Sequence, residues 1–145
     1  MPTDFSPHFR NKAALVTGGA GFIGSQIARR LIGFGADVRI IDNMITGLES
    51  NIPREAKFYK ASILDDDALR EAAKGCTFVF HQAAMVSVPL SVEQPMFAAQ
   101  NNITGTERVL EAAKDLGVRR VVFASSGSVY GGEPRLPSRE EDPVD

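Results

Sequence analysis

The chain passes from a predicted strand to a predicted helix through Thr17-Gly18-Gly19-Ala20-Gly21-Phe22-Ile23-Gly24, directly after the apolar run Ala13-Ala14-Leu15-Val16. Three of these glycines have the spacing G-x-x-G-x-x-G. The first permits a tight turn, the second permits close approach of a pyrophosphate, and the third lets a helix pack on the strand. A helix at 22–34, with apolar residues at helical spacing, would point its free N–H groups at that anion. The stretch therefore predicts a nucleotide-binding β–α unit; the alternative is a glycine-rich loop without a ligand.

A second predicted strand, at 37–42, ends in Asp42, 18 residues after Gly24. Dinucleotide-binding folds place an acidic residue about 20 residues after the glycines, where it accepts hydrogen bonds from the adenosine ribose. A carboxylate there would repel a 2′-phosphate, so NAD is favoured over NADP. Arg39 does not change this preference, because three residues upstream it belongs to the body of the strand. The alternative role for Asp42 is that of a turn residue at the strand end.

Composition bounds the partners and the location. The 145 residues suffice for one domain, 43% of them are hydrophobic, and the net charge is −2. This charge gives no reason to expect a nucleic acid or an anionic membrane as a partner. Cys76 is the only cysteine, so an intrachain disulfide is excluded and a reducing compartment is expected. Residues 1–11 do not resemble a signal peptide and no apolar run is long enough for a membrane span, so we expect a cytoplasmic location.

Strand and helix patterns alternate along the chain. Strands are predicted at 13–17, 37–42, 57–60, 77–81 and 120–125, and helices at 22–34, 65–74 and 92–116. Apolar strands that alternate with helices indicate a parallel sheet covered on both faces. Right-handed crossovers then give an α/β, Rossmann-like doubly wound sheet with strand order 3-2-1-4-5. The family that the motifs below resemble implies, in addition, a C-terminal substrate domain, which these 145 residues lack. We expect an N-terminal extension at 1–11, an incomplete NAD-binding domain at 12–132 and a polar tail at 133–145.

Five motifs occur in the order typical of the extended short-chain dehydrogenase/reductases, which the chain resembles from Lys12 to Pro143. They are the glycine stretch 17–24, Asp42-Asn43, His81-Gln82-Ala83-Ala84, Asn102-Ile103-Thr104-Gly105-Thr106 and Ser125-Ser126-Gly127-Ser128-Val129-Tyr130-Gly131. Among these NAD-dependent epimerases and dehydratases, the segments 83–89 and 91–95 are similar to the UDP-glucose and UDP-N-acetylglucosamine 4-epimerases. Nucleotide-sugar dehydratases and decarboxylases share most of the motifs.

The resemblance implies a role for each motif. Toward the adenosine half of NAD it assigns the pyrophosphate to Gly18, Gly21, Phe22, Ile23 and Gly24, the ribose to Asp42 and Asn43, and closure on the ribose phosphate to Thr46 and Gly47. The adenine position falls on Ser62 and Ile63, where the family usually has an aspartate before the hydrophobic residue. Along the other half it assigns Ala83 and Ala84 to the nicotinamide side, Asn102 to a position near the cofactor, Ser126 to the reacting sugar hydroxyl, and Ser87 to a position near the sugar.

One part of the family's catalytic machinery is absent from the 145 residues. In the related enzymes a tyrosine removes a proton from a sugar hydroxyl while hydride passes to NAD, and a lysine four residues later lowers the pKa of that tyrosine. Here Tyr59 is followed at the fourth position by Ile63, and Tyr130 by Pro134. We therefore expect the NAD-binding portion of a UDP-hexose 4-epimerase, which transfers hydride transiently between sugar C4 and NAD, inactive as this isolated chain. The alternatives are a stand-alone, non-catalytic NAD-binding or sensor module, and the corresponding part of a dehydratase or decarboxylase.

Several polar residues have simpler structural explanations. Ser126 and its neighbour Ser125 can satisfy backbone groups at a strand end. His81 is expected to end its strand as a structural residue, and with only His8 elsewhere no metal site is predicted. The run Asp65-Asp66-Asp67 is predicted to begin a helix, where acidic residues favour the helix dipole.

The helix at 92–116 is expected to be partly buried and partly an interface. Its buried residues are predicted to be Phe97, Val109, Leu110 and Ala113. The resemblance implies that this helix also packs in a dimer, so a homodimer is expected, with a nucleotide-sugar such as a UDP-hexose as the substrate of the complete enzyme.

Overall fold

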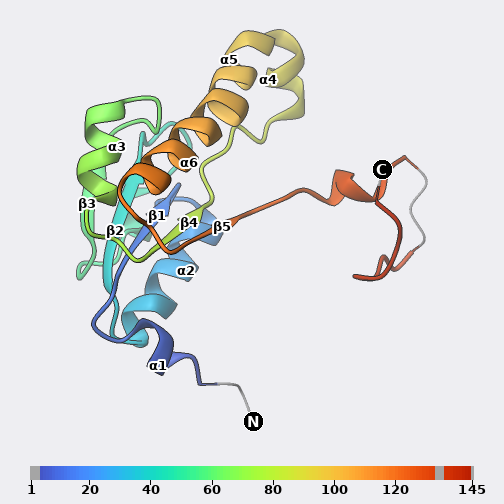
Figure 1. Cartoon of the computed structure of the whole chain (residues 1–145). Helices are drawn as coiled ribbons and strands as arrows, with labels where there is room; N and C mark the ends of the chain where they lie inside the picture. Colours follow the sequence, from blue (N-terminus) through green and yellow to red (C-terminus); the bar gives the residue numbers. More distant parts are fainter. Residues whose placement is uncertain (1–3, 133–135, 145) are drawn as a thin grey trace.

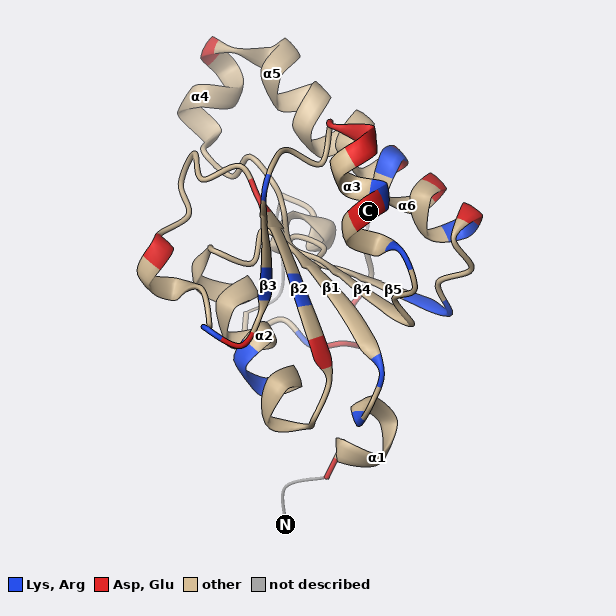
Figure 2. Cartoon of the chain, turned by 90° about the vertical axis from the view of Figure 1, so that its left-hand side faces the viewer, with Lys and Arg blue, Asp and Glu red and all other residues tan. Residues whose placement is uncertain are grey.

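Five parallel strands form one sheet in the computed structural model, which describes residues 4–132 and 136–144. The strands are β1 (Ala13–Thr17), β2 (Asp37–Asp42), β3 (Lys57–Lys60), β4 (Phe78–His81) and β5 (Arg120–Phe123). Their order across the sheet is β3-β2-β1-β4-β5 (Figures 1 and 2). This order confirms the predicted α/β, Rossmann-like fold class. The strand order reverses between β1 and β4, which is where ligands bind in such sheets.

The strand register brings the ends of three strands together. Thr17, the last residue of β1, pairs with Ile41 of β2 and with His81 of β4. In a parallel sheet these carboxyl ends share one edge. The candidate site residues that follow the three strands therefore start from neighbouring positions.

Helices cover both faces of the sheet. One face carries α2 (Phe22–Gly33), and the other carries α3 (Asp66–Ala73) and α6 (Gly105–Asp115) (Figure 1). Successive residues of β1 point to opposite faces. Val16 packs with Leu31 beneath α2, whereas Leu15 packs with Leu69 and Val109 beneath α3 and α6. Because both faces are buried, β1 is apolar along its length rather than alternating.

The N-terminal extension contains a short helix, α1 (Ser6–Phe9), that the sequence analysis did not predict. The Phe9 ring stacks on Phe34 with 5.9 Å between ring centroids, and it meets Phe78 of β4 edge-on at 5.2 Å. Aromatic packing of this kind explains why so short a segment folds back on the domain. Residues 1–3 of the predicted extension lie outside the described residues.

The helix predicted at 92–116 is wrong in its first part. A separate helix, α4 (Val88–Glu93), ends before Pro95. A second helical run then begins as α5 (Pro95–Ala99), continues through a π-helical segment (Gln100–Thr104) and passes into α6. Proline has no N–H with which to extend the hydrogen bonds of α4, but it fits the first position of a new helix. Pro95 therefore divides the predicted helix in two.

Burial along this second helical run differs from the prediction at one position. Val109 and Ala113 are buried as predicted, and Phe97 is half-buried. Leu110 is 49% exposed instead of buried. Its neighbour Val109 already occupies the face turned toward the sheet, and the next position along a helix lies on a different face.

Other boundaries differ by a few residues. Strand β5 ends at Phe123 rather than at Ser125, and the chain then extends away from the sheet to a 3-10 turn at Gly127–Tyr130 (Figure 1). The predicted helix start at the acidic run is confirmed, because the Asp65 side chain accepts a hydrogen bond from the Ala68 nitrogen at the N-terminus of α3. Of the predicted tail, residues 133–135 and 145 lie outside the described residues. Within the described ranges, no helix is long and apolar enough to cross a membrane.

Candidate nucleotide-binding site

The glycine turn between β1 and α2 leaves no room for side chains. Gly18 has a φ of +65°, which L side chains rarely adopt, and a Cβ there would lie 2.7 Å from the Ala83 nitrogen. A Cβ on Gly24 would lie 2.9 Å from the Gly18 carbonyl carbon, so α2 begins directly against the turn. The sequence analysis did not single out Gly19, yet a Cβ there would lie 2.6 Å from Ile40 Cγ2. Side chains at Gly18, Gly19 and Gly24 would therefore clash with the end of β4, with Ile40 of β2 and with the turn itself, respectively.

The first turn of α2 is open to a ligand. Gly21 is its N-cap residue, and glycine offers no side chain to the free N–H groups that follow. Phe22 and Ile23 are 83% and 61% exposed, so Ile23 does not join the buried face of α2, which includes Leu31. An N-terminus that presents free N–H groups and the positive end of the helix dipole is suited to a pyrophosphate.

Asp42 is held against the glycine turn by backbone hydrogen bonds. As the last residue of β2, it accepts from the Ala20 nitrogen through Oδ2 at 3.0 Å and from the Met44 nitrogen through Oδ1 at 2.8 Å. Each carboxylate oxygen can accept a further hydrogen bond. Arg39 lies in the body of the strand, as predicted, with its guanidinium donating to the Lys74 carbonyl at 2.6 Å. The Asp42 carboxylate is therefore oriented beside the turn, and its oxygens keep the capacity to accept from a ribose.

The loop after β2 folds over the same carboxylate. A Cβ on Gly47 would lie 2.7 Å from the Ala20 Cβ and 2.9 Å from Asp42 Oδ1. Asn43 accepts from the Ile45 nitrogen at 3.2 Å, and Thr46 is exposed. The structure thus brings Asp42 and Gly47 together with the glycine turn, while the ligand contacts predicted for Asn43 and Thr46 stay predictions.

A buried hydrogen-bond network fixes the ends of β1 and β4. The Thr17 hydroxyl is 2.7 Å from His81 Nδ1, and it accepts from the Gln82 and Ala83 nitrogens, each at 3.1 Å. Burial lowers the pKa of His81 from 6.5 to about 4, so the imidazole is neutral near pH 7. Thr17 therefore donates to Nδ1, and its oxygen accepts the two N–H groups. His81 is a structural residue, as predicted, and it positions the backbone that leads into Ala83.

The network continues from β4 into the second helical run. The Thr106 hydroxyl donates to the Asn102 carbonyl at 2.8 Å, so its oxygen accepts from His81 Nε2 at 3.0 Å. The Asn102 side chain then accepts from the Met85 nitrogen at 2.8 Å and donates to the Met85 carbonyl at 3.0 Å. Asn102 thus anchors the backbone just after the half-buried Ala83 and the exposed Ala84, the two residues predicted to line the nicotinamide side.

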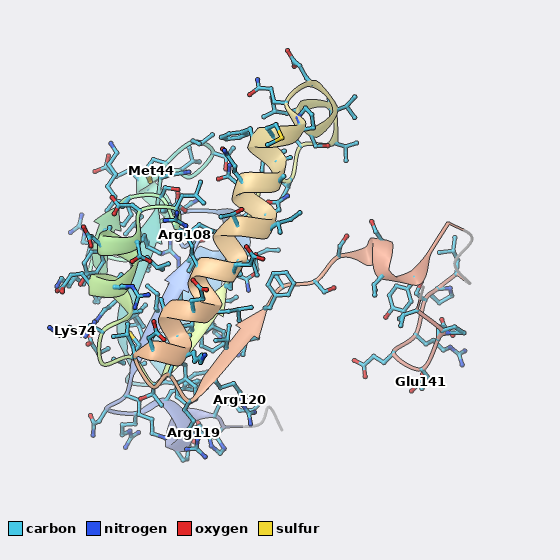
Figure 3. All side chains as sticks on the ribbon, turned by 45° about the horizontal axis from the view of Figure 1, so that its top comes forward. Met44, Lys74, Arg108, Arg119, Arg120 and Glu141 are labelled. Carbon is cyan, nitrogen blue, oxygen red and sulfur yellow. The ribbon has the colours of Figure 1, made fainter. Side chains whose placement is uncertain are left out.

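The segment predicted to contact adenine is fixed by the core. Ile63 is 6% exposed and belongs to the core beneath α3 and α6, and a Cβ on Gly105 would lie 2.6 Å from its Cδ1. The Ser62 hydroxyl accepts from the Leu64 nitrogen at 3.1 Å. Arg108 extends from α6 toward this segment (Figure 3) and donates to the Leu64 carbonyl at 2.5 Å. The Ile63 side chain therefore does not face a ligand, and its predicted contact would have to use the backbone.

The two predicted substrate residues are not brought into this cluster. The Ser87 hydroxyl caps α4 by accepting from the Leu90 nitrogen at 3.3 Å. Ser126 precedes the 3-10 turn that lies away from the sheet (Figure 1), and its hydroxyl accepts from the Ser128 nitrogen at 3.2 Å. Both serines are exposed and make the local backbone contacts of the simpler explanation. Their contacts with a sugar stay predictions.

The part of the chain that the structure describes contains no group of three His, Cys, Asp or Glu side chains able to hold a metal ion. The two nitrogens of His81 are both within hydrogen-bond distance of threonine hydroxyls. The arrangement therefore offers backbone N–H groups, a carboxylate and close-packed glycines, which are the features that hold a nucleotide rather than a metal.

A parallel sheet of order 3-2-1-4-5, with a glycine turn at its switch point and a carboxylate held against that turn, defines a Rossmann-like α/β protein. Over residues 14–145 the chain matches the model of the NAD dependent epimerase/dehydratase family, and it belongs to that family.

Relatives of several activities share this region. The UDP-glucose 4-epimerase of Streptomyces lividans is 40% identical over 133 residues, which are 90% of this chain and 40% of that protein. A UDP-N-acetyl-alpha-D-glucosaminuronate decarboxylase of Bacillus cytotoxicus is 39% identical over 139 residues, covering 90% of this chain and 41% of the relative. The structure of the Thermus thermophilus UDP-glucose 4-epimerase in complex with NAD superposes with a TM-score of 0.83 and 39% identity, covering 92% of this chain and 44% of that one. The chain thus spans about two fifths of the length of the relatives it matches.

Proposed function

We propose that this chain binds NAD at the switch point between β1 and β4, as the cofactor-binding portion of a nucleotide-sugar epimerase of the UDP-hexose 4-epimerase type. The observation that carries the proposal is the hydrogen bond of 3.0 Å between the Asp42 carboxylate and the Ala20 nitrogen. It sets the predicted ribose acceptor beside the open N-terminus of α2, where a pyrophosphate would bind. A dinucleotide needs these two features next to each other.

Each part of the site has a separate task in this proposal. Bound NAD would supply hydride acceptance and return. The glycine turn and the first N–H groups of α2 hold the pyrophosphate, and Asp42 accepts from the ribose hydroxyls and disfavours a 2′-phosphate. The backbone at Ala83 and Ala84, held through Asn102, lines the nicotinamide side. Contacts of Ser126 and Ser87 with the sugar of the substrate stay predictions, because both serines make only local contacts outside this cluster.

The 145 residues lack the tyrosine–lysine pair that, by resemblance to the related enzymes, would carry out the proton transfer that accompanies hydride transfer. Neither tyrosine of the chain has a lysine four residues later. General acid–base catalysis contributes about 10²–10⁴-fold to rate. We therefore expect no turnover of UDP-glucose or UDP-N-acetylglucosamine by these 145 residues alone, and sustained turnover by purified protein would contradict this expectation.

Calorimetry with NAD and NADP tests the binding site. We expect the Asp42→Ala variant to bind NAD at least about 10-fold more weakly, because hydrogen bonds to a charged group contribute about 1.5–3 kcal/mol. Asp37→Ala is the matched control: it removes the same charge from the opposite end of β2, where the side chain is 64% exposed. Equal NAD affinity of the Asp42→Ala variant and the wild-type chain would refute the assignment.

A second candidate, a nucleotide-sugar decarboxylase or dehydratase, is favoured by one finding. The Bacillus cytotoxicus decarboxylase matches almost as closely as the epimerases. The proposed NAD site is the same in each case, because the chemistry that separates these enzymes lies on the sugar side. Product analysis of the complete enzyme with UDP-glucose and with a UDP-hexuronate distinguishes them.

We also propose that the chain forms a homodimer through α5 and α6. Three apolar side chains at seven-residue intervals are exposed along this helical run: Met96 of α5 at 71%, Ile103 of the π-helical segment at 62% and Leu110 of α6 at 49%. Light scattering should show that Ile103→Lys lowers the dimer fraction. Val144→Lys is the control, because Val144 has the same exposure of 62% but lies in the tail. Equal effects of the two substitutions would contradict the proposed interface.

A further inference from the structure

Ala20, at the tip of the glycine turn, links the turn to the loop that follows β2. Its side chain is fully buried, and both of its backbone polar groups are bonded to that region. The N–H donates to Asp42 Oδ2 at 3.0 Å. The carbonyl accepts from the Leu48 nitrogen at 3.1 Å and from Asn51 Nδ2 at 2.9 Å. These bonds lie on either side of the Ala20 Cα, so together they restrain both of its backbone dihedrals.

Asn51 is itself held in place from α2. It ends a 3-10 turn, Glu49–Asn51, in which its nitrogen donates to the Leu48 carbonyl at 3.0 Å. Its own carbonyl accepts from Arg29 Nη2 at 2.8 Å. These two bonds fix the Asn51 backbone against the loop and against α2, so its side chain reaches the Ala20 carbonyl from a fixed position. No role was predicted from the sequence for Asn51 or for Arg29.

We propose that Asn51 is a positioning residue for the adenosine half of NAD, acting through the Ala20 carbonyl. The proposal rests on the NAD-binding function proposed above. Holding the Ala20 carbonyl restrains the ψ angle of Ala20, and through the shared Cα it restrains the preceding peptide, whose N–H bonds Asp42. It also keeps the loop folded so that Gly47 stays against the Asp42 carboxylate. When the hydrogen bond from Asn51 Nδ2 to the Ala20 carbonyl is broken, the Asp42 carboxylate loses its fixed position relative to the pyrophosphate site.

The same hydrogen bond from Asn51 to Ala20 also fixes the start of α2. The Gly21 N–H belongs to the same peptide group as the Ala20 carbonyl, and it points the opposite way to donate to the Gly18 carbonyl at 3.1 Å. Rotation of this peptide would therefore disturb the N-cap of α2 together with the ribose acceptor. A residue that neither touches the predicted ligand nor lies on a strand end thus controls both halves of the adenosine site.

Two variants, each with a matched control, test this proposal. Asn51→Ala removes the side-chain donor, and the exposed neighbour Ser50→Ala is its control. Arg29→Ala removes the bond to the Asn51 carbonyl, and Arg30→Ala is its control, because both arginines are exposed on α2 and carry the same charge. Calorimetry on the full chain would measure the dissociation constants of NAD, ADP-ribose and NADP for each protein.

We expect Asn51→Ala to weaken NAD and ADP-ribose by the same factor, about 10-fold, as for one hydrogen bond. Arg29→Ala should give a smaller loss in the same direction. The ratio of NAD to NADP affinity should fall several-fold in both variants, because the carboxylate that rejects a 2′-phosphate is no longer fixed. A purely structural role would lower the unfolding temperature and leave this ratio unchanged.

The outcomes separate this inference from the proposed function. If the wild-type chain does not bind NAD, the proposed function fails and this inference fails with it. If the wild-type chain binds NAD, and the Asn51→Ala and Arg29→Ala variants keep both its NAD affinity and its ratio of NAD to NADP affinity, the inference alone is overturned. Because Arg29 lies on the surface, its variant provides a reading even where Asn51→Ala does not fold.

Discussion

Replacing Thr17 by valine should destabilise the fold through hydrogen bonds alone. Valine has nearly the shape of threonine, so the substitution removes the hydroxyl and leaves the packing of this fully buried residue in place. The hydroxyl contacts His81 Nδ1 at 2.7 Å and accepts from the Gln82 and Ala83 nitrogens at 3.1 Å. Any loss of stability then reports the value of these three contacts.

The magnitude follows from which partners are left unsatisfied. The Gln82 nitrogen keeps a second acceptor, because it also donates to the Thr17 carbonyl at 3.2 Å. The imidazole Nδ1 and the Ala83 N–H lose the hydroxyl on which they depend. A buried polar group without a partner costs about 1–3 kcal/mol. The two groups left without a partner are His81 Nδ1 and the N–H of the half-buried Ala83. We therefore expect the free energy of unfolding to fall by about 2–3 kcal/mol.

Urea denaturation of three proteins measures this effect. Thr17→Ser keeps the hydroxyl and loses one methyl group, so it should cost about 1 kcal/mol. The wild-type chain sets the reference, and equal m-values justify comparing the transitions. If Thr17→Val proves more stable than Thr17→Ser, the network does not stabilise the junction of β1 and β4, and the reasoning is refuted.

Three further predictions follow from burial and close contact. Between pH 6.5 and about 4, His81 is protonated in the unfolded chain but stays neutral in the folded chain, where it is buried. The free energy of unfolding should therefore fall by about 3 kcal/mol as the pH drops through this window, and then level off. A His81→Gln variant with the same pH dependence would contradict this. Gly47→Ala should weaken NAD binding at least about 10-fold by pushing on the Ala20 methyl, whereas Gly33→Ala, with open space around its Cβ, should not, and equal calorimetric affinities would count against the crowding argument. Burial raises the pKa of the Cys76 thiol to about 11, so a thiol reagent at pH 8 should modify the native chain at least about 100-fold more slowly than the urea-unfolded chain, and fast native labelling would show that the thiol is accessible.

The predictions that held depend on local, periodic signals. The glycine turn, the strand that ends at Asp42 and the strand order could be predicted because spacing and apolar runs reflect backbone geometry directly. The division of the helix at Pro95 was also visible in the sequence, but one continuous helix was predicted through it, at 92–116. The sequence analysis therefore gave too little weight to the missing N–H of proline.

What the sequence analysis missed depends on single long-range hydrogen bonds. Asn51 reaches the Ala20 carbonyl across 31 residues, and His81 reaches Thr106 across 25. Neither contact has a repeat, a spacing rule or a charge pattern that would reveal it. The aromatic packing of Phe9 is similar, because a phenylalanine in a polar segment does not indicate which ring it will meet. Such contacts become visible only when the sheet has set the distances between chain segments.

The sequence separations divide the proposed site into two parts that form by different means. On the ribose and pyrophosphate side, the bonds of Ala20 to Asp42 and to Asn51 span 22 and 31 residues, within the first β–α–β unit and the loop that follows it. On the nicotinamide side, Thr17 must meet His81 across 64 residues before the backbone at Ala83 is fixed. Closing a longer loop costs more entropy, and these contacts exist only once β4 has paired with β1. The ribose and pyrophosphate contacts therefore depend on the first β–α–β unit and the loop after it, whereas the nicotinamide side depends on the whole sheet, through the buried Thr17 and the neutral His81.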